Sequence, residues 1–194
     1  MKKQLIFATG NANKMREIRE ILGDSEYEIV SMKEAGIDVD IVEDGTTFEE
    51  NATIKAKTIM EMTGKLTLAD DSGLEIDALN GEPGIYSARY LGENTSYDIK
   101  NQTILDRLKD VPEEKRGARF VCAIAAAFPN GQIRTTRGIM EGIIGYEIKG
   151  ENGFGYDPIF YLPKIEKYSA ELSSDEKNAL SHRGAALRQI KGLI

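Results

Sequence analysis

The 194-residue sequence has one cysteine, one histidine, no tryptophan and five prolines. Because Cys122 stands alone, no internal disulfide bond can form, and Cys122 with His182 is too small a set for a Cys/His zinc site. The two residues could still form a catalytic nucleophile and its base. Cys122, however, lies in the apolar run from Phe120 to Phe128, which predicts a buried strand and an inert core thiol.

Long hydrophobic runs are also missing from the sequence. No apolar stretch approaches the ~18 residues that are needed to cross a membrane. The N-terminal run from Leu5 to Ala8 is too short for the core of a signal peptide. We therefore expect a cytoplasmic, soluble protein that has no membrane partner.

Positive charge is in deficit, with 25 Lys and Arg residues against 32 Asp and Glu residues and a net charge of -7. A broad nucleic-acid-binding face normally needs a basic surplus, so we expect no nucleic-acid partner. Hydrophobic residues make up 41% of the chain, which is enough for a packed core. The length predicts one domain, residues 1–194.

The order of apolar segments predicts an α/β fold. Gln4–Ala8 is typical of a buried strand, a helix with an apolar stripe from Met15 to Leu22 follows, and Tyr27–Val30 predicts a second strand. A second helix begins near Thr47, and the next buried strand, Leu66–Ala69, is expected to end at the two following aspartates.

The second half of the chain adds a β-hairpin. Ser96–Leu108 predicts a helix, whereas Arg119–Phe128 and Gln132–Ile139 flank a Pro-Asn-Gly turn. A C-terminal helix is expected from Ser174, with a break at Gly184. A βαβ unit and a hairpin together indicate a mixed sheet flanked by helices. The middle hairpin region is expected to form much of a second lobe, which would leave a ligand-binding cleft.

The first chemical motif lies between the first strand and the first helix. Thr9, Gly10, Asn11 and Lys14 place donors, an open backbone and a positive charge at a helix N-terminus, where anions bind. The alternative is an ordinary helix cap with a solvated lysine. The motif is not a Walker A loop, because no G-x-x-x-x-G-K-[ST] pattern exists in the chain.

Asp70 and Asp71 form the second motif, directly after a buried strand. Two carboxylates at a strand end suit Mg²⁺, which takes oxygen ligands and keeps several waters. Successive strand residues point to opposite faces, so both reach one ion only if the strand has ended. Otherwise one binds metal while the other orients a loop, or the segment is a simple turn. Glu43 and Lys55 by themselves are typical of a solvated loop and a solvated helix face.

Two further motifs suit a nucleoside. In Gly153–Pro158, two glycines expose backbone beside two aromatic rings that could stack on a base, or that could instead pack in the core. Asp157 could accept a hydrogen bond from a ring N–H. Lys177, His182 and Arg183 form a basic cluster that could donate to an oxygen or simply end a helix.

Six motifs in order identify a resemblance to a known family. They are Thr-Gly-Asn-x-x-Lys at 9–14, Phe-x-Glu-Asn-Ala at 48–52, Asp-Asp-Ser-Gly-Leu at 70–74, Pro-Gly-Ile-Tyr-Ser-Ala-Arg-Tyr at 83–90, Gly-Phe-Gly-Tyr-Asp-Pro at 153–158, and Glu-Lys-Asn-Ala-x-Ser-His-Arg-Gly at 176–184. Over nearly the whole chain the sequence resembles the inosine/xanthosine triphosphate pyrophosphatases, the house-cleaning enzymes that act on non-canonical purine nucleotides.

The resemblance implies an elongated mixed sheet with two lobes and a homodimer. It also implies Mg²⁺-dependent hydrolysis of ITP, dITP and XTP to the monophosphate and pyrophosphate, which clears deaminated purines from the nucleotide pool. Two alternatives stay open: a related pyrophosphatase for modified pyrimidine or canonical nucleotides, and a nucleotide sensor without catalysis.

The resemblance also assigns roles to individual residues. The triphosphate would be contacted by Thr9, Gly10, Asn11, Lys14 and Lys55, with Ser72 as a further substrate contact. Glu43 and Asp71 would bind the metal, Asp70 is a possible third ligand, and Asp71 would be the proton acceptor. The nucleoside would be bound by Phe154, Gly155, Tyr156, Asp157, Lys177, His182 and Arg183. Donors on Arg183 and His182 aimed at O6 would accept hypoxanthine and xanthine and leave adenine poorly matched.

Overall fold

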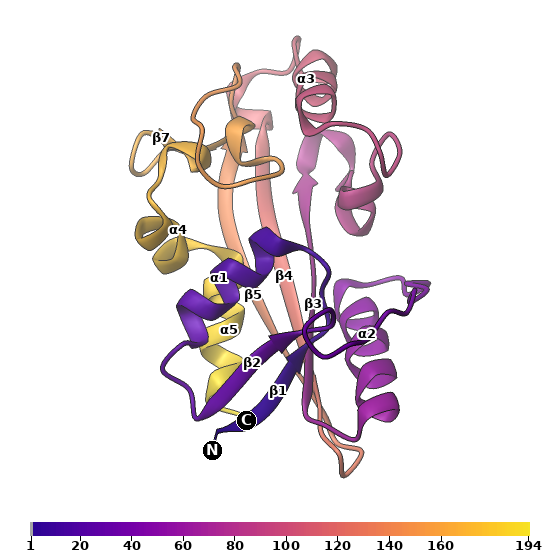
Figure 1. The fold of residues 1–194 in the computed structure, drawn as a ribbon. Coiled ribbons are helices and arrows are strands. Elements are labelled where there is room, and N and C mark those ends of the chain that lie inside the picture. Colours follow the sequence, from indigo (N-terminus) through magenta and orange to yellow (C-terminus); the bar gives the residue numbers. More distant parts are fainter. Residues whose placement is uncertain (1) are drawn as a thin grey trace. The chain divides into compact units, whose positions relative to one another are not determined.

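A computed structural model describes residues 2–194, in which strands and helices alternate along most of the chain (Figure 1). The strands are β1 (Lys3–Phe7), β2 (Tyr27–Ser31), β3 (Thr67–Ile76), β4 (Gly117–Ala127), β5 (Ile133–Ile144), β6 (Phe160–Leu162) and β7 (Lys167–Tyr168). The helices are α1 (Ala12–Leu22), α2 (Phe48–Thr63), α3 (Tyr97–Arg107), α4 (Ser174–Leu180) and α5 (His182–Lys191). The expected α/β class is confirmed.

The strands form one open, mixed sheet in the order β2-β1-β3-β4-β5-β6-β7. β1 pairs in parallel with both β2 and β3, which is the βαβ arrangement that the sequence predicts. β6 pairs antiparallel with β5 and with β7. β4 and β5 are neighbours joined by a short turn, in which the N–H of Gly131 donates to the Phe128 carbonyl and the N–H of Phe128 donates to the Gln132 carbonyl.

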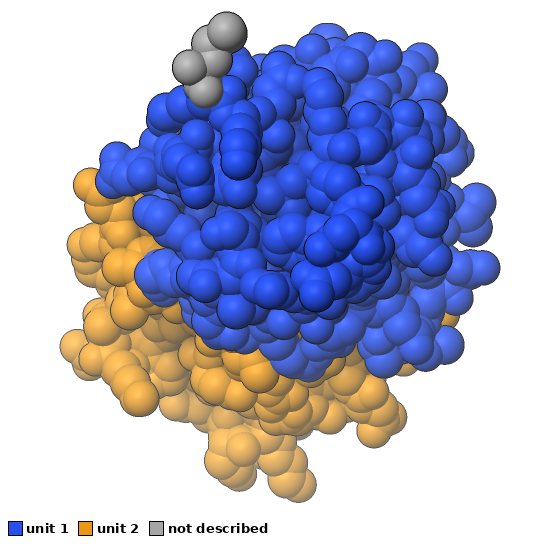
Figure 2. Space-filling view, turned by 90° about the horizontal axis from the view of Figure 1, so that it is seen from below, with its two compact units in different colours: residues 1–71, 122–138, 182–194 blue, residues 72–121, 139–181 orange. Residues whose placement is uncertain are grey.

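The chain divides into two compact units, which Figure 2 draws in different colours. The first unit contains the chain up to Asp71, together with Cys122–Gly138 and His182–Ile194. The second contains Ser72–Val121 and Ile139–Ser181. The unit boundaries therefore fall within β3, β4 and β5, and the second unit includes part of the predicted hairpin region.

The first unit has a core on each face of its part of the sheet. On one face, Leu68 of β3 packs with apolar residues of α1 and α5, including Ile18 and Leu187. On the other face, Ala69 of β3 packs with α2, including Ile59. Because consecutive strand residues point to opposite faces, the next two residues of β3 also divide between these two sides.

The second unit has its own core around Leu74, Phe120 and Phe160. Arg116 is fully buried beside this core and donates to the backbone carbonyls of Leu108, Ile144 and Gly145. Its guanidinium thereby satisfies carbonyl groups after the end of α3 and the end of β5, where regular backbone pairing stops.

Two boundaries differ from the sequence prediction. β3 does not end at the aspartates but continues to Ile76, because apolar residues after them, such as Leu74, remain buried in the second unit. The C-terminal helix breaks at Ser181 rather than at Gly184. Ser181 has an extended backbone, and its N–H donates to the Lys177 carbonyl as α4 ends.

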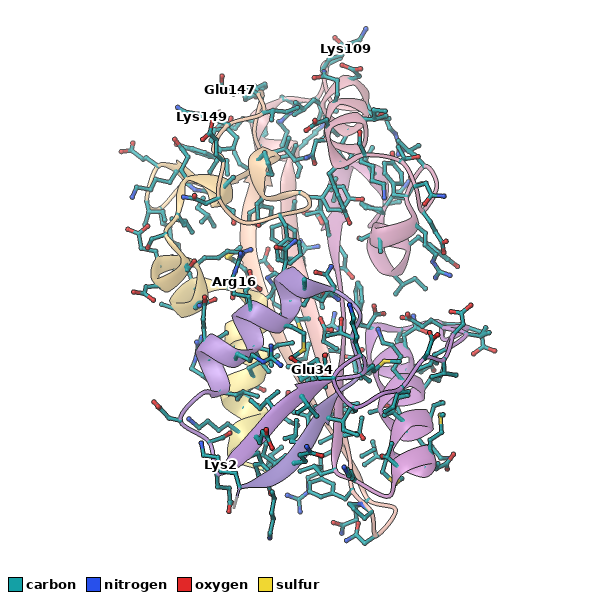
Figure 3. All side chains as sticks on the ribbon, in the orientation of Figure 1. Lys2, Arg16, Glu34, Lys109, Glu147 and Lys149 are labelled. Atoms are coloured by element: carbon teal, nitrogen blue, oxygen red, sulfur yellow. The ribbon has the colours of Figure 1, made fainter. Side chains whose placement is uncertain are left out.

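Charged side chains away from the cores are mostly solvated. Figure 3 labels several charged residues, among them Arg16, Glu34 and Lys109, and all three are exposed. Within the described part of the chain, no helix combines the length and the hydrophobicity needed to cross a lipid bilayer.

Candidate functional site

The loop from Thr9 to Lys14 is folded by its own side chains. The Thr9 hydroxyl accepts from the N–H of Asn11 at 3.1 Å, and the Asn11 side chain caps α1 by accepting from the N–H groups of Asn13 and Lys14. These two helix-terminal donors are therefore already hydrogen-bonded. Gly10 is exposed, and no atom would lie within 4 Å of a Cβ there, which leaves open space beside its backbone.

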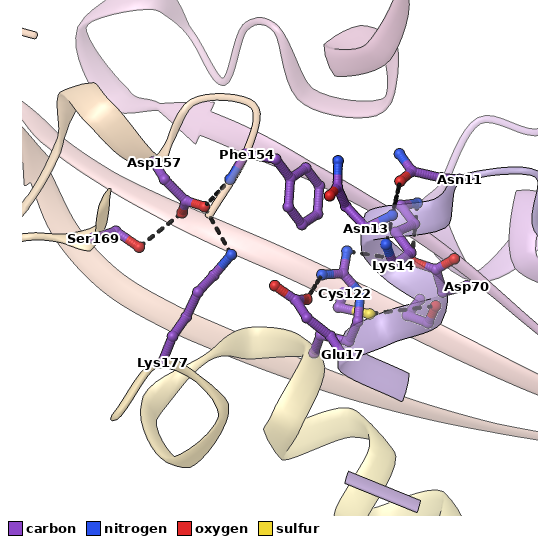
Figure 4. Close-up of polar contacts among 12 residues, drawn as sticks. Asn11, Asn13, Lys14, Glu17, Asp70, Cys122, Phe154, Asp157, Ser169 and Lys177 are labelled. Atoms are coloured by element: carbon purple, nitrogen blue, oxygen red, sulfur yellow. Dashed lines mark hydrogen bonds and ion pairs between the residues drawn. The ribbon is translucent and has the colours of Figure 1, made fainter. Parts of the chain in front are cut away.

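Asp70 lies at the centre of a buried charge cluster on the side of β3 that α1 and α5 cover (Figure 4). Its Oδ2 is 3.0 Å from the Lys14 ammonium and 3.5 Å from the Arg183 guanidinium. Arg183 also forms an ion pair with Glu17 of α1. Burial by itself would raise the pKa of Asp70, but the charges of Lys14 and Arg183 hold it well below its usual range.

Asp71 lies on the opposite side of β3, toward α2. Its Oδ2 accepts a hydrogen bond of 3.2 Å from the amide of Asn51, a residue that is only 1% exposed. Burial raises the pKa of Asp71 to about 6, against the opposing effects of Lys55, Lys14 and the Asn51 hydrogen bond. Relative to an ordinary aspartate, the pKa of Asp70 is therefore lowered and the pKa of Asp71 is raised.

Glu43 and Lys55 meet at the N-terminal part of α2, where the Glu43 carboxylate is 3.1 Å from the Lys55 ammonium. By themselves these residues are typical of separate, solvated positions, and the resemblance assigns them different roles; the structure brings them together as an ion pair. Within residues 2–194, no group of three or more His, Cys, Asp or Glu side chains is arranged to hold a metal ion. Glu43 and Asp71 do offer the oxygen donors that Mg²⁺ takes, and this ion commonly uses only one or two carboxylates together with waters and substrate phosphates.

In the second unit, Asp157 organises the glycine-rich loop (Figure 4). Its two oxygens accept from the Ser169 hydroxyl at 2.7 Å, the Lys177 ammonium at 2.7 Å and the Phe154 N–H at 2.9 Å. The Lys177 ammonium also lies 4.6 Å from the centre of the Phe154 ring. Gly153 has a φ of +71°, and a Cβ there would lie 2.2 Å from Asp157, so only glycine fits this turn.

The two aromatic residues of this loop have different environments. Phe154 is half-buried, whereas Tyr156 belongs to the core of the second unit and donates its hydroxyl to the Ser87 carbonyl at 2.6 Å. The ring of Tyr97 packs edge-on against Tyr156 at 5.1 Å. The half-buried ring of Phe154 is therefore compatible with stacking on a base, whereas the ring of Tyr156 packs in the core.

The other predicted residues have simpler placements. Ser72 is partly exposed in β3 and belongs to the second unit. His182 is buried at the start of α5 in the first unit, where β5 packs so closely that a Cβ on Gly138 would lie 2.0 Å from the His182 carbonyl oxygen. Cys122 is buried in the core that includes Leu68, and burial raises the pKa of its thiol to about 12, which confirms the inert core thiol.

Three residues of these clusters were missed by the sequence reasoning. Asn51 stands in the Phe-x-Glu-Asn-Ala motif, but no role was assigned to it. Glu17 occupies a buried position of α1 among apolar neighbours, and a charge within an apolar stripe is the signal that could have found it. Ser169 lies in a segment without a motif, so only the fold identifies it.

Comparison with known proteins is consistent across sequence and structure. The model of the Ham1 family matches residues 5–193. A dITP/XTP pyrophosphatase of Desulforamulus reducens is 49% identical over 191 residues, which cover 98% of this chain and 95% of that protein. The dITP/XTP pyrophosphatase of Bacillus subtilis is 46% identical over 192 residues, which cover 99% of this chain and 97% of that protein.

A solved structure supports the same relationship. The HAM1 protein from Coxiella burnetii is 42% identical to this chain, aligns with a TM-score of 0.89 and covers 98% of each chain. A match of the family model to almost the whole chain, relatives at nearly half identity and a shared fold agree with one another. The chain therefore belongs to the Ham1 family.

Proposed function

We propose that this protein hydrolyses non-canonical purine nucleoside triphosphates, namely ITP, dITP and XTP, to the monophosphate and pyrophosphate. The observation that carries the proposal is Asp71, a buried carboxylate whose pKa of about 6 suits a proton acceptor near neutral pH. Relatives at 46–49% identity are dITP/XTP pyrophosphatases, which supports the substrate class.

The first unit supplies the groups for phosphate chemistry in this proposal. The exposed backbone of Gly10 and the side chains of Thr9 and Asn11 lie in the loop that would contact the triphosphate. Lys14 and Lys55 supply positive charge, which would stabilise the negative charge on the departing pyrophosphate. Ser72 directly follows the catalytic carboxylate and is assigned as a further substrate contact.

Mg²⁺ is the metal that we propose, because nucleotide pyrophosphatases generally use a divalent ion and the available donors here are carboxylates. Glu43 and Asp71 would hold it. When bound, the ion would supply Lewis acidity and neutralise phosphate charge. Asp71 would also take a proton from the attacking water. Asp70 is engaged with Lys14 and Arg183, so we assign it to positioning rather than to the metal.

The nucleoside would be recognised by groups from two segments. In the second unit, Phe154 and Gly155 offer a ring face and an open backbone, while Asp157 and Lys177 hold the loop in shape. The remaining assigned residues are Tyr156 in the same loop and His182 and Arg183 at the start of α5. Donors on His182 and Arg183 would select a base that carries O6, and they would leave the amino group of adenine without a hydrogen-bond acceptor.

We further propose that residues 1–194 act as one catalytic domain, that the protein is a cytoplasmic homodimer and that its role is to clear deaminated purines. The homodimer and the clearing role rest on the family resemblance, whereas the single domain and the location rest on the sequence itself. Light scattering of the purified protein would measure the mass of the assembly against the 21.5 kDa of one chain.

The decisive experiment compares nucleotides side by side. The purified protein with Mg²⁺ is given ITP, dITP, XTP, dUTP, GTP and ATP, and pyrophosphate and inorganic phosphate are measured separately. We expect pyrophosphate as the product, with kcat/KM for ITP, dITP and XTP about 10²-fold or more above that for ATP. Equal turnover of ATP and ITP would contradict the base assignment, and preference for dUTP would support the pyrimidine alternative. Nucleotide binding without hydrolysis would indicate a sensor.

A further inference from the structure

Asn51 connects the two segments that carry the proposed metal ligands. Its side-chain Nδ2 donates to Asp71 Oδ2 at 3.2 Å, and its Oδ1 accepts from the N–H of Gly45 at 2.9 Å. Asp71 belongs to β3, whereas Gly45 lies two residues after Glu43 in the loop before α2. A single buried amide thus contacts the strand that carries one carboxylate and the loop that carries the other.

The two hydrogen bonds require a side chain with a donor at one end and an acceptor at the other. An amide meets this requirement in one orientation, since its NH₂ group must face the carboxylate and its oxygen must face the backbone N–H. Asn51 is 1% exposed, so loss of either group would leave a buried polar partner unsatisfied. Neither an apolar side chain nor a carboxylate reproduces both contacts.

The loop packs directly on this amide. A Cβ on Gly45 would lie 2.7 Å from Asn51 Oδ1 and 2.7 Å from Glu50 Cβ, so a glycine is needed for the backbone to come this close. The start of α2 is held as well, because Glu50 accepts from the N–H and hydroxyl of Thr46 while Thr47 caps the helix. The loop that follows Glu43 is therefore fixed in place at the helix N-terminus.

Helix periodicity places a second contact on the same face of α2. Lys55 is one turn after Asn51, and its ammonium lies 3.1 Å from Glu43. One helix face therefore contacts Glu43 through Lys55 and Asp71 through Asn51. We propose that Asn51 is a positioning residue that preorganises Glu43 and Asp71 as the carboxylate pair of the metal site. This inference rests on the proposed function of those two residues.

The test measures metal binding without nucleotide, so that it does not depend on catalysis. Mn²⁺ is titrated into the purified protein, and free Mn²⁺ is followed by electron paramagnetic resonance. We expect Asn51→Leu, which keeps the approximate volume and removes both hydrogen bonds, to raise the Mn²⁺ Kd about 10-fold, as is typical when a partner of a metal ligand is lost. At saturating Mg²⁺, kcat for dITP should fall by about 10-fold or more, while KM for dITP changes by less than about 3-fold.

The matched control is Ala56→Gly, which weakens the same helix within its apolar core but removes no side-chain hydrogen bond, because alanine has no polar side-chain group. It should lower the melting temperature and leave the Mn²⁺ Kd and kcat unchanged. If Asn51→Leu does not fold, Asn51→Ser provides a smaller polar replacement whose shorter side chain cannot reach both partners. Circular dichroism shows which variants are folded.

Asp71→Asn separates failure of this inference from failure of the proposed function. If wild-type protein binds Mn²⁺, Asp71→Asn loses the binding and folded Asn51 variants retain the wild-type Kd, then the positioning role of Asn51 is wrong and the metal assignment stands. If Asp71→Asn binds Mn²⁺ as wild type does, the metal assignment itself is wrong. Loss of affinity in the Asn51 variants but not in Ala56→Gly supports the inference.

Discussion

The two sides of β3 shift the pKa values of two neighbouring carboxylates in opposite directions. On the side of α1 and α5, Asp70 is matched by the cations Lys14 and Arg183, and its pKa is held low. On the side of α2, Asp71 accepts from the neutral amide of Asn51, and burial raises its pKa to about 6. The same residue type, one position apart, is a firmly ionised anion within an ion-pair cluster in one case and the proposed proton acceptor in the other.

The difference teaches that burial alone does not decide what an acidic residue does. Both side chains are buried, so desolvation opposes ionisation in each. Two cations within 3.5 Å overcome that effect at Asp70, whereas Glu43 adds negative charge near Asp71 and partly offsets Lys55 and Lys14. We infer that Asp70 stabilises the fold around the site and that Asp71 performs chemistry. Identical substitutions at the two positions test this contrast.

The largest effect is expected for Asp71→Asn on catalysis. Asparagine has nearly the same shape but can neither accept the proton of water nor supply a negative charge to a metal. We expect kcat/KM for dITP to fall at least about 10³-fold, since general-base catalysis and metal binding are lost together. The melting temperature should stay the same or rise, because the substitution removes a buried negative charge whose desolvation is not fully compensated by its neighbours. A variant with near wild-type hydrolysis would contradict the assignment of Asp71.

The next effect concerns stability and is expected at Asp70→Asn. This change leaves Lys14 and Arg183 without their shared carboxylate in a buried site. Breaking a buried ion pair from one side typically lowers the free energy of unfolding by about 3 kcal/mol or more. Urea unfolding with Asp71→Asn as the matched control measures this difference. Equal stability of the two variants would mean that the cluster around Asp70 does not stabilise the fold.

The sequence predicted which helices and strands exist better than it predicted the residues at which they begin and end. Apolar runs and caps located β1, α1 and α2, because a buried face and a capping side chain are local features, as with Thr47 and Glu50. The end of β3 was misplaced, since two aspartates look like a strand end. They lie within the strand, which continues into the buried residues that follow, and Lys14 and Arg183, distant in sequence, compensate the charge of Asp70 there.

The sequence names candidate site residues, but it does not predict the contacts among them. The family resemblance assigns roles to Asp71 and Lys55, yet nothing local indicates that Lys55 pairs with Glu43 or that Asn51 holds Asp71. Such contacts depend on tertiary packing of α2 against β3. Glu17 illustrates the same limit, because its partner Arg183 lies 166 residues away in the chain.

The smallest expected effect is a pH dependence that separates the two aspartates in metal-free protein. The pKa of Asp71 is about 6 in the folded state, above the ~3.9 of an unfolded aspartate, so between these values the folded chain binds a proton that the unfolded chain does not. Lowering the pH from about 7 to about 5 should therefore stabilise the wild type relative to Asp71→Asn by about 1 kcal/mol. The pKa of Asp70 is depressed, so its stabilisation is complete above the unfolded value and does not change in this window. Unfolding of the wild type and of Asp71→Asn, measured in a metal chelator at both pH values, gives the difference. A relative loss of stability on acidification would show that Asp71 is matched in the way that Asp70 is.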